Sequence, residues 1–303
     1  MVSPITIKRI LCPIDFSEYS RQAINRAVAL AGEYSGTITA LHVVTQAVPP
    51  RPPDLPVLYP PIVFTPDDLE QFRKHTRQFV EEQNDGAPID VIVAVGNTAT
   101  EIVRVAEELP ADMIVIGTHG RSGFDRLMLG SVTERILRRV RCPVLTVPRR
   151  HGPDAVYPQR LFTRILCATD FSASSRKALS YASSIAERAN AELTVIHVVE
   201  LMPTFEPAGV GLPDEKDHRL PGTADARERL HGALAGRVAL SRHVGEVVTS
   251  GKPYREILRV AEEQRSDLIV IGVHGGIAGL PAFGSTVNHV VRQATCPVLS
   301  LRA

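Results

Sequence analysis

The sequence predicts an α/β protein with two tandem domains, each built on a parallel sheet that is covered by helices on both faces. The first observation is that short apolar runs alternate with segments whose apolar residues recur at helical spacing. The second is that blocks of the first half return in the second half at an almost constant offset. The length of 303 residues agrees, since single domains often have about 150 residues.

The repeat is visible in five blocks. The segment ILCPIDFS at 10–17 returns as ILCATDFS at 165–172, an offset of 155 residues from Asp15 to Asp170. The other blocks are HVV at 42–44 and 197–199, EIVRVAEE at 101–108 and EILRVAEE at 256–263, IGTHG at 116–120 and IGVHG at 271–275, and CPVL at 142–145 and 296–299. The last block has an offset of 154, so the second copy lacks one residue between Gly275 and Cys296. Chance does not keep one offset through five blocks, and the chain is therefore a duplicated domain.

The boundary between the halves lies in a polar, Pro-containing stretch without apolar periodicity. We expect the first domain over residues 1–148, a linker over 149–160 and the second domain over 161–303.

Within the first half, five apolar runs predict the strands in order. They are residues 7–14, 37–44, 89–95, 113–116 and 144–147. Helical spacing predicts the intervening helices at 17–34, 98–108 and 131–139. Parallel sheets of this kind bind ligands beyond the carboxyl ends of their strands, so the residues that follow the strands are the candidates for function.

A Pro-rich segment interrupts this alternation after the second run. Residues 45–68 carry eight prolines, and Pro fixes φ and lacks an N–H, so we expect no regular element there. The counterpart, residues 200–223, also contains Pro and Gly. Either a variable surface connection or a lid or partner-docking loop fits both segments.

The segment after the fourth run has the features of a phosphate-binding loop. Gly117 and Gly120 permit close backbone approach, while Gly130 and Ser131 stand where a helix begins and offers N–H groups and its dipole. Ser131 fits an N-cap, a phosphate contact, or both. The loop matches neither GxxxxGK[ST] nor a GxGxxG after the first strand.

The spacing G-x2-G-x9-G-[ST] after the fourth run, with IDFS at 14–17 and LHVV at 41–44, resembles the universal stress protein family, and the two copies resemble its tandem members. The resemblance implies a five-stranded parallel sheet in a Rossmann-like domain, similar to the adenine nucleotide alpha hydrolases. In the nucleotide-binding branch it also implies ATP along the strand ends. It further implies pairing of last strands between domains, here within the chain, and leaves a homodimer open.

The same resemblance assigns the site residues. In the first half Pro13 and Asp15 would border the adenine and ribose, and Val43 would contact the adenine. The residues that would line the ribose and phosphates are Gly117, Gly120, Gly130, Ser131, Val132 and Thr133, and Ile116 directly precedes this glycine loop. Their second-half counterparts are Asp170, Val198, Gly272, Gly275, Gly284 and Ser285.

The second half departs from the pattern. Its glycine loop has eight residues where nine are expected, and Pro281 lacks an N–H and stiffens it. Ala168 replaces Pro13, and Arg121 and Arg126 have no counterparts. We therefore expect the ATP motif to be intact in the first domain and degraded in the second.

Several of these residues also have a structural interpretation. His42 and His197 are predicted to be packed histidines rather than catalytic bases. His119 and its counterpart His274 fit either phosphate proximity or a hydrogen bond that stabilises the loop. Asp15 and Asp170 fit helix capping as well as ligand contact. The four cysteines, Cys12, Cys142, Cys167 and Cys296, are expected to be small buried hydrophobes without redox function.

Composition narrows the class of protein. With 34 Lys and Arg against 33 Asp and Glu, the net charge of +1 gives no reason to expect nucleic acid or an anionic membrane as a partner. The N-terminal stretch lacks the apolar core of a signal peptide, and no apolar run approaches the ~20 residues that span a bilayer. Four cysteines are too few for a disulfide framework, so we expect a cytoplasmic protein.

The sequence favours nucleotide binding over catalysis. It has no cluster with metal-ligand spacing, so any Mg²⁺ would sit on the ATP phosphates, and it shows no clear general base. We expect a nucleotide-responsive stress-response module with little or no turnover and no catalytic residues. The alternatives are a slow ATPase, although CPIDFS stands where pyrophosphatase relatives have SGGxDS, and a nucleotide-free interaction scaffold.

Overall fold

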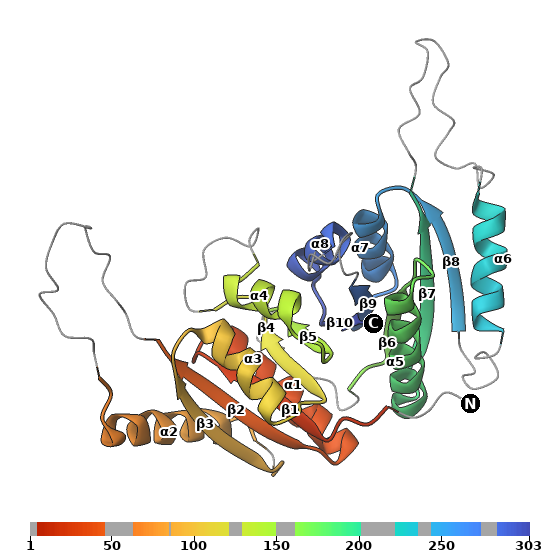
Figure 1. Ribbon diagram of the computed structural model, residues 1–303. Coiled ribbons are helices and arrows are strands. Elements are labelled where there is room, and N and C mark those ends of the chain that lie inside the picture. The colour runs from red at the N-terminus through yellow and green to blue at the C-terminus, as the bar shows by residue number, and fades with distance from the viewer. Residues whose placement is uncertain are drawn as a thin grey trace, which may run out of the picture. The chain divides into compact units, whose positions relative to one another are not determined.

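A computed structural model describes residues 5–45, 63–84, 86–120, 129–149, 161–200, 222–235, 244–273 and 284–303. These residues divide into two compact units, one within 6–149 and one within 161–303 that also includes Ile5. Each unit is a parallel sheet with helices packed against it (Figure 1), which confirms the predicted α/β class and its duplication. Residues 150–160 of the predicted linker lie outside the described residues.

The first unit has its strands in the order β3-β2-β1-β4-β5, all parallel. They are β1 (Arg9–Ile14), β2 (Thr37–Val44), β3 (Ile89–Val95), β4 (Met113–Gly117) and β5 (Val144–Val147). The helices are α1 (Glu18–Tyr34), α2 (Pro66–Glu81), α3 (Thr98–Glu108) and α4 (Ser131–Arg139). Since the chain leaves β1 toward β2 and returns to β4 on the other side, the strand order switches between β1 and β4, where α/β sheets bind ligands.

The second unit repeats this topology as β8-β7-β6-β9-β10. Its strands are β6 (Arg164–Ala168), β7 (Glu192–Val199), β8 (Val244–Ser250), β9 (Leu268–Val273) and β10 (Val298–Arg302). Its helices are α5 (Ala173–Ala189), α6 (Thr223–Leu234), α7 (Pro253–Glu263) and α8 (Ser285–Gln293).

The central strands are buried on both faces, which explains their continuous apolar runs. In β1 every residue after Arg9 is buried, and β4 is buried throughout. On one side α1 lies beside α2, where Arg21 reaches Glu82 at 3.4 Å and lies over the Phe79 ring. Helix α3 packs against α4. Crossovers between parallel strands are almost always right-handed, so the reversal of strand order after β1 puts these two pairs on opposite faces, as predicted.

The prediction of an irregular segment over 45–68 is wrong at its end, because α2 begins at Pro66. Thr65 is its N-cap and forms a capping box with Asp68, and Pro66 occupies the first turn, where its missing N–H costs nothing. In the second unit α6 likewise begins at Thr223, the last residue of the counterpart segment. Residues 46–62 and 201–221 lie outside the described residues.

The described helices do not combine the length and the hydropathy that a bilayer demands, so none of them could cross a membrane.

Candidate functional site

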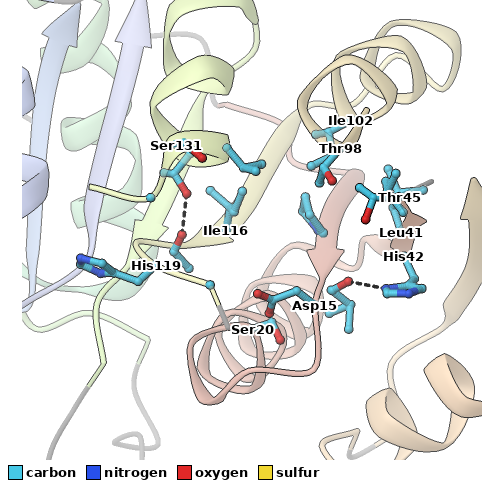
Figure 2. A pocket seen from close by; sticks show the side chains of 18 of the residues that line it. Asp15, Ser20, Leu41, His42, Thr45, Thr98, Ile102, Ile116, His119 and Ser131 are labelled. Atoms are coloured by element: carbon cyan, nitrogen blue, oxygen red, sulfur yellow. Dashed lines mark hydrogen bonds between the residues drawn. The ribbon is translucent and has the colours of Figure 1, made fainter. Parts of the chain in front are cut away.

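A pocket of about 560 Å³ opens in the first unit at the carboxyl ends of β1 and β4 (Figure 2). Ten of the residues predicted from sequence line it: Pro13, Asp15, Val43, Ile116, Gly117, Gly120, Gly130, Ser131, Val132 and Thr133. These are all the first-half candidates, and they come from the ends of three strands and from the start of α4. The pocket lies where the strand order switches, as the topology requires.

The glycines of this loop stand where side chains do not fit. An ideal β-carbon on Gly117 would lie 2.7 Å from Tyr19 Cβ, and one on Gly120 would lie 2.7 Å from Asp15 Oδ2. On Gly130 it would lie 3.0 Å from the Thr118 carbonyl oxygen. The backbone therefore passes close to the pocket wall in a way that only glycine permits without displacement.

Two hydrogen bonds join the two ends of the loop. The Gly130 N–H donates to the Thr118 carbonyl at 2.9 Å. Thr133 Oγ1 donates to the Gly117 carbonyl at 2.8 Å, and this bond is buried (dashed in Figure 2). Together they fix the first turn of α4 against the end of β4.

The N-cap of α4 is Gly130, so the interpretation of Ser131 as the cap is wrong. Gly130 has φ −56° and ψ 131°, no side chain caps the helix, and Ser131 is its first residue. The Gly130 N–H donates to the Thr118 carbonyl, and a β-carbon at this position would crowd the same oxygen. With no side-chain cap, the first turn of α4 presents N–H groups and the positive end of its dipole at the pocket.

Asp15 lies between β1 and α1, and it is not the helix cap. Its Oδ1 accepts hydrogen bonds from the Ser17 N–H at 3.0 Å and from Ser17 Oγ at 2.6 Å. Ser17 is the N-cap of α1 and accepts from the Ser20 N–H. The second unit has the same arrangement, in which Asp170 Oδ1 accepts from the N–H of the N-cap Ser172 at 3.1 Å. The capping interpretation of both aspartates is therefore wrong, and their carboxylates support the caps instead.

The histidines hold the backbone, as their structural interpretation predicts. His42 Nδ1 lies 2.8 Å from the Ile14 carbonyl, and His197 Nδ1 lies 2.8 Å from the Thr169 carbonyl. Because a carbonyl only accepts, each Nδ1 carries the proton. His119 Nδ1 lies 3.0 Å from Thr118 Oγ1, which is the expected hydrogen bond within the loop.

Other residues line the pocket without having been predicted to do so. They are Ile14, Ser20, Leu41, Val44, Thr45, Phe72, Thr98 and Ile102, together with His42, which was given a structural role. His119, for which phosphate proximity and a loop hydrogen bond were both left open, also lines the pocket. Thr98 is the first residue of α3, close after β3, so the general expectation that ligands bind beyond strand ends could have found it. Phe72 was missed because α2 was not recognised.

In the second unit the described candidates are Asp170, Val198, Gly272, Gly284 and Ser285. A β-carbon on Gly272 would lie 2.5 Å from the Ser175 nitrogen, and Gly284 is the N-cap of α8, which begins at Ser285. Gly275, His274, Pro281, Arg121 and Arg126 lie outside the described residues. The expected weakening of the second motif stays a prediction.

The described residues contain no group of three or more His, Cys, Asp or Glu side chains that could hold a metal ion. Cys12, Cys167 and Cys296 are buried, as predicted, whereas Cys142 is partly exposed. Burial raises the pKa of the Cys12 thiol far above its usual value, so the reactive thiolate is suppressed.

Comparison with known proteins gives one consistent result. The model of the universal stress protein family matches residues 6–148 and 161–302. A universal stress protein of Mycolicibacterium smegmatis is 28% identical over 315 residues, which cover 100% of this chain and 99% of that protein. One from Methanocaldococcus jannaschii is 32% identical over 155 residues, covering 47% of this chain and 82% of the relative. The crystal structure of a universal stress protein from Archaeoglobus fulgidus DSM 4304 superposes with a TM-score of 0.67 at 25% identity, covering 97% and 98% of the two chains.

Proposed function

The chain belongs to the universal stress protein family as a tandem, two-domain member, and we propose that its first domain binds ATP in the pocket between β1 and β4. The observation that carries this proposal is the convergence of all ten predicted first-half residues on one pocket. Its volume of about 560 Å³ falls in the range of small-molecule sites.

The glycine loop and α4 form the phosphate end of the proposed site. Backbone N–H groups and the positive helix terminus attract an anion without a basic side chain. Gly117, Gly120 and Gly130 allow the backbone to approach, and the Thr133 bond to Gly117 keeps the loop and helix in register. This chemistry explains how a protein of net charge +1 would hold a polyphosphate.

The ends of β1 and β2 form the base and ribose end. Val43 and Ile116 are buried apolar side chains that suit an adenine face. Phe72 adds an aromatic ring from α2. Asp15 presents a carboxylate beside the glycine loop, where it would accept hydrogen bonds from ribose hydroxyls.

We propose that the site acts by binding ATP rather than by hydrolysing it. Phosphoryl transfer needs charge stabilisation and an oriented nucleophile, and no Lys or Arg is among the described residues of the pocket wall. Mg²⁺ would bind through the ATP phosphates. Five further points stay predictions. They are weak or absent binding by the second domain, the domain boundaries at 1–148 and 161–303, pairing of the two domains, a homodimer and a cytoplasmic location.

Titration calorimetry with ATP, ADP and AMP tests the proposal. Gly130→Asp places a carboxylate where the phosphates would lie. Asp is a good N-cap, but its β-carbon would lie 3.0 Å from the Thr118 carbonyl oxygen, so urea denaturation must first show that the variant folds like the wild type. Gly284→Asp makes the same change at the matching N-cap of α8. We expect wild type and Gly284→Asp to bind ATP and Gly130→Asp to lose binding.

Absence of wild-type binding below about 1 mM, or a dissociation constant unchanged by Gly130→Asp, would contradict the proposal. If the wild type releases phosphate from ATP with Mg²⁺ much faster than Gly130→Asp does, the slow ATPase is favoured instead. If native mass spectrometry of the gently purified protein detects no bound nucleotide, the nucleotide-free interaction scaffold is favoured.

A further inference from the structure

Phe16, the residue between Asp15 and Ser17, has an unusual backbone conformation. Its φ is 64°, in the left-handed region that a bulky aromatic residue rarely adopts. Such a conformation persists only where the surrounding structure determines it, and it is concentrated at ligand sites. The residue therefore needs an explanation from its neighbours.

Three rings surround Phe16, and we call Phe16, His42, His75 and Phe79 the aromatic clasp. The Phe16 centroid lies 4.6 Å from that of His42 on β2. It lies 4.5 Å from His75, with the planes stacked at 28°, and 5.5 Å from Phe79 in an edge-on arrangement. His75 and Phe79 both belong to α2. Helix α2 thus holds the Phe16 ring against the end of the sheet.

The backbone of Phe16 determines where the Asp15 carboxylate lies. The chain turns at Phe16 so that the N–H and Oγ of Ser17 both reach Asp15 Oδ1. The other oxygen, Oδ2, faces the glycine loop, 2.7 Å from the place of a β-carbon on Gly120. If Phe16 left the left-handed region, Ser17 would move and the carboxylate would lose the bonds that orient it.

The second unit contains the same device with a different partner. Phe171 has φ 65°, and its ring centroid lies 4.5 Å from that of His197. The guanidinium of Arg229 on α6 lies 4.5 Å from the Phe171 centroid and takes the place of His75. Asp170 Oδ1 again accepts from the N–H of the N-cap residue, Ser172. The left-handed phenylalanine recurs while its helical partner changes.

We propose that Phe16 is a positioning residue that fixes the Asp15 carboxylate against the glycine loop, and that α2 holds Phe16 in this role through the aromatic clasp. The consequence for ligands rests on the proposed function, in which Asp15 accepts hydrogen bonds from ribose hydroxyls. Phe72 of α2 also lines the pocket, and its ring centroid lies 5.8 Å from that of His42. Helix α2 therefore reaches the pocket by two routes, through the clasp and through Phe72.

The test compares ATP with 2′,3′-dideoxy-ATP, which lacks the hydroxyls that Asp15 would bind. In the wild type we expect ATP to bind at least about 10-fold more tightly, as for hydrogen bonds to a charged group. Phe16→Gly accepts φ 64° without strain but removes the ring. We expect the ratio of the dideoxy-ATP dissociation constant to the ATP dissociation constant to fall toward 1, as in Asp15→Ala. Dideoxy-ATP binding itself should change little. Phe16→Tyr should restore the ratio.

Phe171→Gly is the matched control, since it makes the same change in the other unit and should leave the ratio unchanged. If Phe16→Gly does not fold, His75→Ala removes the stacked ring alone and should lower the ratio in part. A folded Phe16→Gly or His75→Ala with the wild-type ratio would overturn the inference.

A second readout separates this inference from the proposed function. Hydrogen exchange of the Ser17 amide reports its bond to Asp15 without any ligand. We expect faster exchange in Phe16→Gly than in the wild type. If the wild type binds no nucleotide, the proposed function fails, and unchanged Ser17 exchange would overturn the positioning role as well.

Discussion

Gly117 and Tyr19 approach so closely that a β-carbon on residue 117 would lie 2.7 Å from Tyr19 Cβ and 3.0 Å from the Tyr19 carbonyl carbon. This contact packs α1 against the end of β4, beneath the pocket. Gly272 stands in the same relationship to Ser174 and Ser175 in the second unit. The glycine at the start of the loop thus serves helix packing as well as ligand access.

Gly117→Ala should therefore destabilise the protein. The new methyl group meets backbone atoms of Tyr19, which cannot move without shifting α1, so we expect a loss of about 1–3 kcal/mol in the free energy of unfolding. Urea denaturation measures it. Gly32→Ala is the control, because nothing lies within 4 Å of a β-carbon there. That change, in the last turn of α1, should stabilise by about 0.5–1 kcal/mol, and equal effects at the two positions would refute the packing argument.

Gly120→Ala should affect binding rather than stability. Its β-carbon would meet only the Asp15 carboxylate, which is the end of a side chain and can turn away. We expect the free energy of unfolding to change by less than about 0.5 kcal/mol. ATP affinity, measured by calorimetry, should fall about 10-fold because the carboxylate no longer faces the ligand. Unchanged affinity would show that Asp15 takes no part in binding.

Thr133→Val tests the bond that joins α4 to β4. Valine keeps the shape of threonine but leaves the buried Gly117 carbonyl without the Thr133 Oγ1 donor at 2.8 Å. We expect a loss of about 1–3 kcal/mol in the free energy of unfolding by urea denaturation. Thr133→Ser retains the hydroxyl and should recover most of that loss. If serine and valine cost the same, the hydrogen bond is not the source of the effect.

The regular elements could be predicted where an apolar run has clear ends. Strands β2, β3 and β5 and helices α3 and α4 have the predicted bounds. The first strand was predicted to begin at Ile7 but begins at Arg9. Ile7 is buried like a strand residue, yet the N–H groups of Lys8 and Arg9 donate to the Asp112 side chain, both at 2.8 Å. The apolar pattern predicts burial, and burial alone does not show at which residue the hydrogen bonds between strands begin.

The glycine loop of the pocket could be predicted because it follows an apolar run and precedes a helix, and the strand-end residues were assigned by the resemblance to the universal stress protein family. The part of the pocket formed by α2 could not be predicted. The prolines before α2 indicated an irregular segment, so the helix start capped by Thr65 and Asp68 was not recognised. Phe72 and the clasp residues His75 and Phe79 were missed for the same reason. The left-handed Phe16 had no signal in the sequence, because that region usually belongs to Gly, Asn or Asp.

The capping box of α2 should make stability depend on acid. Hydrogen bonds from the Thr65 N–H and hydroxyl hold the pKa of Asp68 below its usual value of 3.8. A carboxylate whose pKa is lower in the folded state stabilises the fold above its unfolded pKa, and this contribution is lost as the pH falls through the folded value. Acid should therefore loosen the start of α2.

Asp68→Asn measures this contribution directly. The difference in the free energy of unfolding between wild type and variant, from urea denaturation, should be constant from about pH 7 to about pH 5 and shrink below the usual pKa. Asp67→Asn is the matched control, because Asp67 lies in the same first turn but the capping box is formed by Asp68. The contribution of the capping box is the decline with acid seen for Asp68→Asn beyond any seen for Asp67→Asn. A wild-type advantage over Asp68→Asn that persists undiminished at about pH 2 would mean that the charged capping box does not stabilise α2.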